Sequence, residues 1–179
     1  MVPAHKAWDV GNLRQMSTGP RFLVNDLGKL KLCTNEQHMF YGDTIQETRQ
    51  MFFNSWEKYQ HKKPLSPLEN EIVQVILAHP EYHKILDQQN KFQQQSYFSE
   101  LGDHNPFLHM GLHLAVREQI ATDRPTGISA IYKNLVKKHN DPLMVEHLIM
   151  DQLAECLWHS QKNNSPLDER YYLQTLANL

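Results

Sequence analysis

The chain has 179 residues, enough to build one domain around a hydrophobic core. Hydrophobic residues make up 40% of it and charged residues 21%, proportions typical of a soluble globular protein. A formal net charge of -2 offers no basic face to nucleic acid or to an anionic membrane, so we expect neither as a partner.

Histidine is the unusual component, with eleven residues that near neutral pH can carry protons or bind metal. The two cysteines, Cys33 and Cys156, are far apart and form no C-x-x-C pair, so neither a disulfide framework nor a zinc ribbon is indicated. No segment approaches the ~20 apolar residues of a membrane span, and no signal-peptide pattern opens the chain. We therefore expect a cytoplasmic protein.

Residues 1–38 differ from the rest of the chain, because their scattered apolar residues show no helical spacing and are interrupted by glycine and proline. We interpret them as a poorly ordered extension, or as a gene start placed too far upstream with Met39 as the true initiator. A targeting or partner-binding arm is the other interpretation. The folded domain is expected to cover residues 39–179.

Three expected helices begin with a polar capping residue followed directly by proline, at Ser66-Pro67, Asn105-Pro106 and Asp141-Pro142. Helical spacing of apolar residues predicts helices over 44–60, from 67 to about 79, from 80 onward, 106–122, 128–138, 142–161 and from about 168 to 176. No stretch shows the alternation typical of strands. We therefore expect an all-α fold, a single bundle of about six or seven helices.

His109 and His113 lie four residues apart in an expected helix that is apolar on several sides, so they share one face of it. We expect both imidazoles to point into the interior, where they must be hydrogen-bonded, metal-bound or catalytic. Their H-x-x-x-H spacing resembles a zinc-protease motif, but Met110 stands where that motif has its glutamate base.

Two further stretches carry candidate ligands. His147, Asp151 and Glu155 follow one another at four-residue intervals among apolar residues, and we expect this stripe to face the interior as well. His79 and His83 flank a bend, because Pro80 disfavours the helical conformation at the residue before it. His79 either caps the second helix or points inward.

Helical bundles build metal sites by bringing such positions to one central point. The candidate ligands are His79, His83, His109, His113, His147, Asp151 and Glu155. Histidines combined with carboxylates suit zinc, iron or manganese, so a divalent metal is the expected cofactor. A metal-bound water with Glu155 as base would support hydrolysis. The sequence leaves open whether the protein is an enzyme.

The alternative is a non-enzymatic structural or protein-interaction module in which these groups form a hydrogen-bonded core network. His109 and His113 would then bond to carboxylates across a helix interface, and Arg117 would neutralise a carboxylate. Such a module could hold a partner, or a second copy of the chain in a homodimer, through an exposed aromatic patch. The aromatic residues available for it, whose other explanation is core packing, are Phe52, Phe53, Trp56, Tyr171 and Tyr172.

Several segments resemble the family known as domain of unknown function 1841. They are PLSPLE (64–69), HPEYH (79–83), NPFLHMGLHLA (105–115), DRPTGI (123–128) and EHLIMDQLAECLW (146–158). The resemblance covers about residues 39–172, with Asp151 standing where relatives carry glutamate. It implies a small bacterial protein with no assigned activity, and so it bears on the extent of the domain and not on a mechanism.

Overall fold

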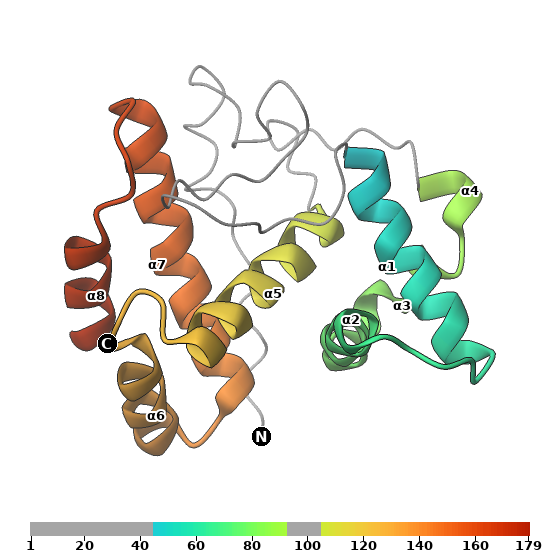
Figure 1. The fold of residues 1–179 in the computed structure, drawn as a ribbon, viewed down its shortest axis with the longest axis horizontal. Helices are drawn as coiled ribbons and strands as arrows, with labels where there is room; N and C mark the ends of the chain where they lie inside the picture. Colours follow the sequence, from blue (N-terminus) through green and yellow to red (C-terminus); the bar gives the residue numbers. More distant parts are fainter. Residues whose placement is uncertain (1–44, 93–104) are drawn as a thin grey trace.

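The structure, a computed structural model, describes residues 45–92 and 105–179 (Figure 1). The expected extension over residues 1–38, with Met39, lies outside them. The described residues contain helices and no strand: α1 (Ile45–Gln60), α2 (Pro67–Ala78), the 3-10 turn η2 (Pro80–Tyr82), α3 (His83–Leu86), α4 (Gln89–Phe92), α5 (Pro106–Thr122), α6 (Ile128–His139), α7 (Pro142–Lys162) and α8 (Glu169–Ala177). The predicted all-α fold is confirmed. The helix expected from residue 80 onward is the turn η2 followed by the single-turn helix α3, and the single turn α4 is additional.

The predicted helix starts are built as the sequence indicates. Ser66 Oγ accepts a hydrogen bond from the backbone N–H of Glu69 at 3.3 Å, and the Glu69 carboxylate accepts one from the Ser66 N–H at 2.8 Å, which is a complete capping box. Asn105 Oδ1 accepts from two N–H groups in the first turn of α5. Asp141 caps α7 with one such bond, since its Oδ1 accepts from the N–H of Met144 at 3.0 Å.

The apolar side chains form two cores. The N-terminal core consists of Phe52, Phe53, Trp56, Ile72, Val75, Ile76, Leu86, Phe107, Met110 and Leu114. The C-terminal core consists of Leu112, Val116, Ile128, Leu135, Val145, Ile149, Met150, Leu153, Cys156, Leu157, Tyr172 and Leu176. Helix α5 contributes to both, and Figure 1 shows it between the α1–α2 pair and the group α6–α8.

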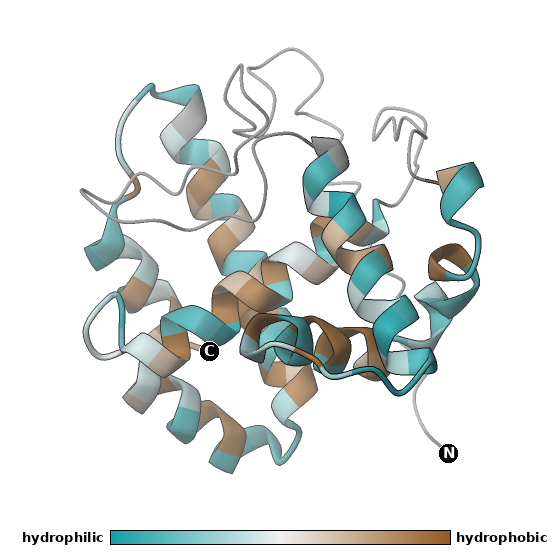
Figure 2. Cartoon of the chain, turned by 45° about the vertical axis from the view of Figure 1, so that its right-hand side comes forward, coloured by the Kyte–Doolittle hydropathy of each residue, from teal (hydrophilic) through white to brown (hydrophobic). Residues whose placement is uncertain are grey.

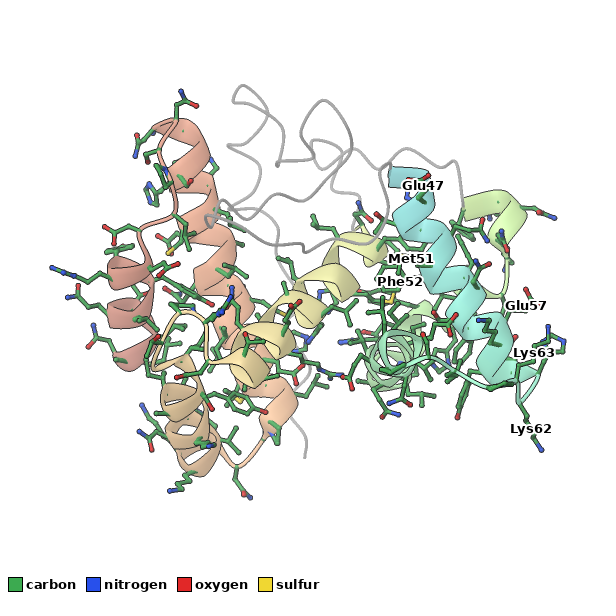
Figure 3. The ribbon with its side chains drawn as sticks, viewed as in Figure 1. Glu47, Met51, Phe52, Glu57, Lys62 and Lys63 are labelled. Atoms are coloured by element: carbon green, nitrogen blue, oxygen red, sulfur yellow. The ribbon has the colours of Figure 1, made fainter. Side chains whose placement is uncertain are left out.

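The helices are amphipathic, with hydrophilic residues on one side and hydrophobic residues on the other, as Figure 2 shows by colour. In Figure 3 Phe52 lies on the side of α1 that faces α2 and α5, whereas Glu57, Lys62 and Lys63 lie at the outer end of that helix. Phe52 is 1% exposed. None of the helices in the described residues is both long and apolar enough to cross a membrane.

The aromatic residues proposed for a partner surface are mostly core residues. Phe52, Phe53 and Trp56 are buried, and the rings of Phe52 and Phe53 lie 6.0 and 5.4 Å from that of Phe107 in α5. Of the tyrosine pair in α8, one ring is buried and the other, Tyr171, is 46% exposed. The core-packing interpretation is therefore confirmed for every one of these residues except Tyr171.

Tyr172 and Gln119 form a buried polar contact between α8 and α5, in which the tyrosine hydroxyl donates to Gln119 Oε1 at 3.0 Å. We expect Tyr172→Phe to lower the free energy of unfolding by about 1–2 kcal/mol, because the buried amide oxygen loses its donor. Urea denaturation measures this. Tyr171→Phe on the same helix is the matched control, expected within about 0.5 kcal/mol of the parent protein. Equal stabilities of the two variants would contradict the prediction.

Cys156 lies in the C-terminal core, and the reactivity of its thiol can be tested. Burial, together with the negative charges of Glu155 and Asp168, raises the pKa of its thiol to about 11. At pH 8 the reactive thiolate is then several hundred times scarcer than at an exposed cysteine of pKa about 8.5. In a Cys33→Ser background we expect very slow alkylation by iodoacetamide in buffer and fast alkylation in urea. Fast labelling of the folded protein would contradict this.

Candidate metal centre

Helix α5 presents three faces, and the middle one carries His109, His113 and Arg117. The neighbouring faces enter the two hydrophobic cores, so this polar face lies between them. His113 is completely buried and His109 is half-buried. The prediction that the two imidazoles point into the protein is confirmed for His113 and holds in part for His109.

His79 reaches the same place from the end of α2. Because it precedes Pro80 it leaves the helical conformation, with φ -125° and ψ 69°, and α2 ends at Ala78. Its ring is not a helix cap and points inward, since no side-chain capping bond is present and His79 is 3% exposed. His147, in the second turn of α7, supplies a fourth imidazole that is half-buried.

The four imidazoles converge through their Nε2 atoms. His113 Nε2 lies 2.9 Å from that of His79, 3.2 Å from that of His109 and 3.1 Å from that of His147. The Nε2 atoms of His109 and His147 are 3.4 Å apart. One nitrogen from each of the four rings lies within 4.8 Å of all the others, so the four rings surround one point.

Two carboxylates determine which way the buried rings are protonated. Glu146 Oε2 lies 2.8 Å from His113 Nδ1, and Glu81 Oε1 lies 3.0 Å from His79 Nδ1. A carboxylate accepts hydrogen bonds, so each Nδ1 carries the proton and donates. In the neutral imidazole the Nε2 atom is then left with its lone pair, and in both rings that lone pair points to the shared centre.

The electrostatics of Glu146 and His113 support these protonation states. Burial disfavours a charged Glu146, but the hydrogen bond from His113 and the positive charge of Arg117 outweigh it, so the pKa of the carboxyl is lowered. Burial lowers the pKa of His113, and the bond to Glu146 opposes this only in part. At neutral pH the pair is therefore a carboxylate and a neutral imidazole.

Arg117 completes the support on α5. Its Nε lies 3.1 Å from each oxygen of Glu146. The sequence-based hypothesis that Arg117 neutralises a carboxylate is thus correct, although the carboxylate is Glu146. Histidine ligands of metals commonly donate their outer N–H to a carboxylate in this way, which fixes the ring and its tautomer.

Asp151 and Glu155 lie away from the four histidines, and the prediction that they face the interior is wrong. Both are exposed, and Glu155 is 3.9 Å from His159 on the protein surface. Helix α7 is apolar on several sides, so apolar neighbours alone did not identify its inner face. The completely buried residues Val145, Ile149 and Leu153 lie on roughly the opposite side of the helix from the 151–155 stripe.

Two carboxylates beside the cluster, Glu81 and Glu146, were not among the predicted site residues, and for Glu146 the sequence held a usable signal. Glu146 lies three and seven residues before Ile149 and Leu153, and so it shares their buried stripe. A carboxylate at helical spacing from those apolar residues was the sequence signal that Glu146 points inward. In the structure Glu146 is 7% exposed.

His83 also stands apart from the cluster. Its Nε2 lies 3.0 Å from the backbone oxygen of Ile76, and its ring packs on Trp56 with 4.6 Å between centroids. This places His83 at the bend after α2, where it bonds a carbonyl near the end of that helix.

Tyr82 covers one side of the cluster. Its ring stacks on that of His79 with a 30° angle between the planes and centroids 5.7 Å apart, and it lies edge-on to that of His109 at 5.6 Å. Burial and the negative charge of Glu81 raise the pKa of the phenol to about 12, so it stays neutral. The turn Pro80–Tyr82 thus orients His79 through Glu81 and packs against it through Tyr82.

A family model described as a domain of unknown function, DUF1841, matches residues 44–178. The chain belongs to this family, as the sequence motifs indicated. No curated protein and no solved structure gives a significant match.

Proposed function

We propose that the protein binds one divalent metal ion, zinc by preference, through the Nε2 atoms of His79, His109, His113 and His147. The proposal rests on one observation: three imidazole nitrogens surround His113 Nε2 at 2.9–3.2 Å. An imidazole Nε2 has one proton or one lone pair, so it can take part in one hydrogen bond of this kind. A cation at the centre accepts all four lone pairs at once.

A hydrogen-bonded core network accounts for these contacts less well. The Nε2 atoms of His79 and His113 are 2.9 Å apart, and the carboxylates beside both rings hold the proton on the far nitrogen of each. With both imidazoles neutral, two lone pairs then face each other without a proton between them. Burying such a pair is unfavourable unless a positive charge lies between the nitrogens.

The spacing of three of the four nitrogens fits a tetrahedral ion. Zinc–nitrogen bonds of about 2.0–2.1 Å place neighbouring ligands of a tetrahedron about 3.3–3.4 Å apart. The Nε2 atoms of His109, His113 and His147 form a nearly equilateral triangle with sides of 3.1, 3.2 and 3.4 Å. Three corners of a square-planar site would instead include one distance about 1.4 times the others.

The proposed role of the ion is structural. Four protein ligands complete a tetrahedral zinc site and leave no position for a reactive water, whereas catalytic zinc sites keep one open. The hydrolase hypothesis gains no support from Glu155, which lies on the exposed side of α7. With no carboxylate among the four donors, the donor set also favours zinc over manganese.

Elemental analysis of the protein, purified without a histidine tag, tests the proposal directly. We expect about one equivalent of zinc per chain, and loss of most of it in His113→Asn, since that ring contacts the other three. His61→Asn is the matched control, because His61 is exposed at the end of α1. This variant should retain the full metal content.

Cobalt keeps the test informative if His113→Asn fails to fold. Cobalt(II) added to the metal-free parent protein should give the intense visible absorption of a tetrahedral site. Folded parent protein that takes up neither metal at micromolar concentration would overturn the proposal.

The carboxylate beside His113 gives a second prediction. Glu146→Gln should weaken zinc binding about 10- to 100-fold, because the ring loses the carboxylate that orients it and raises its basicity. Competition with a chromophoric chelator measures the affinity. Glu155→Gln, on the exposed side of the same helix, should bind zinc like the parent protein. The same affinity in both variants would show that Glu146 does not support the site.

A further inference from the structure

The four histidines are distributed over parts of the chain that belong to different cores. His79 follows α2, whose buried residues Ile72, Val75 and Ile76 lie in the N-terminal core. His147 lies in α7, whose buried residues enter the C-terminal core. His109 and His113 lie on α5, on the face between the two.

An ion bound by all four rings would therefore connect the two halves of the protein. Helix α5 packs against both α2 and α7. The polar contacts around the site already hold α5 to α7, because Glu146 of α7 bonds both His113 and Arg117 of α5. Where the end of α2 meets α5, His79 Nε2 lies 2.9 Å from His113 Nε2, and with both rings neutral and protonated on Nδ1 two lone pairs face each other there.

The α5–α7 contact and the contact between the end of α2 and α5 would consequently respond differently to loss of the ion. Between α5 and α7 the carboxylate–imidazole and carboxylate–guanidinium bonds persist. Between the end of α2 and α5, facing nitrogen lone pairs repel each other once no cation lies between them. The apolar contacts of Phe107, Met110 and Leu114 with residues of α1 and α2 remain, so the two parts stay attached through the N-terminal core.

We infer, on the basis of the proposed metal site, that the ion cross-links residues 45–92 to the helices α5–α8 and that the relative placement of these two parts depends on metal. His79 is the ligand on which this depends, because it is contributed by the N-terminal part. With zinc the two parts form one rigid unit. Without it the apolar contacts of Phe107, Met110 and Leu114 still hold the N-terminal part to α5, but its position relative to α5 varies more widely.

Distances between nitroxide spin labels in the full chain test the inference. One label replaces Glu57, exposed at the outer end of α1 (Figure 3), and the other replaces Arg170, exposed in α8, in a background with Cys33→Ser and Cys156→Ala. We expect a narrow distance distribution with zinc and one at least about twice as broad after chelation. A control pair at Lys133 and Arg170, both in the C-terminal part, should stay narrow in both states.

The variant His79→Ala separates cross-linking from metal binding as such. It keeps three ligands on α5 and α7, so zinc at high concentration should still bind, yet the distribution between positions 57 and 170 should stay broad. Elemental analysis of the same labelled samples distinguishes failure of the proposed metal site from failure of the cross-linking inference. Absence of metal from the parent protein overturns the proposed function, and the inference with it.

The inference alone is overturned if zinc binds stoichiometrically and the distribution between positions 57 and 170 is the same before and after chelation. It is also overturned if chelation broadens the control pair equally, since that result would mean general unfolding and not movement between the end of α2 and α5. A narrow zinc-bound distribution in His79→Ala would overturn it as well, because the cross-link would then not depend on that ring.

Discussion

The hydrogen bond between Glu146 and His113 is the contact on which the rest of the site depends. It places the proton of the imidazole on Nδ1 and leaves the Nε2 lone pair pointing at three other rings. Arg117 compensates the charge that makes this bond possible, since an isolated buried carboxylate would take up a proton. Without the carboxylate the ring could turn its N–H inward, and His113 Nε2 would no longer offer a lone pair to the other three rings.

The local features of the chain made the fold predictable, because they act over a few residues. The capping residues before Pro67, Pro106 and Pro142 define helix starts through hydrogen bonds within a single turn. The bend at His79 follows from the steric effect of the next residue, Pro80. The stripe of His109 and His113 was likewise visible, since α5 has apolar faces on both sides of it.

The candidate site was predictable only where the direction of a helix face was unambiguous. In α7 it was not: apolar residues occur nearly all round the helix, so the stripe of Asp151 and Glu155 could be placed inward or outward with similar support. Packing against α5 and α8 decides it, and that packing buries Ile149 and Leu153 and, in the same register, Glu146. Contacts between distant segments carry this information, and a pattern along one helix does not contain it.

Helix α5, which carries His109 and His113, contains a second buried polar contact with which the histidine cluster can be compared. Gln119 of α5 also meets a buried polar group from another helix, the hydroxyl of Tyr172, and there one donor faces one acceptor at 3.0 Å. Hydrogen bonding accounts for that contact completely, and it needs no further partner. Six residues earlier in α5, His113 Nε2 has a single electron pair for three neighbouring nitrogens. A core network selected for stability alone would resemble the Tyr172–Gln119 pair. The excess of electron pairs around His113 is what a cation site requires.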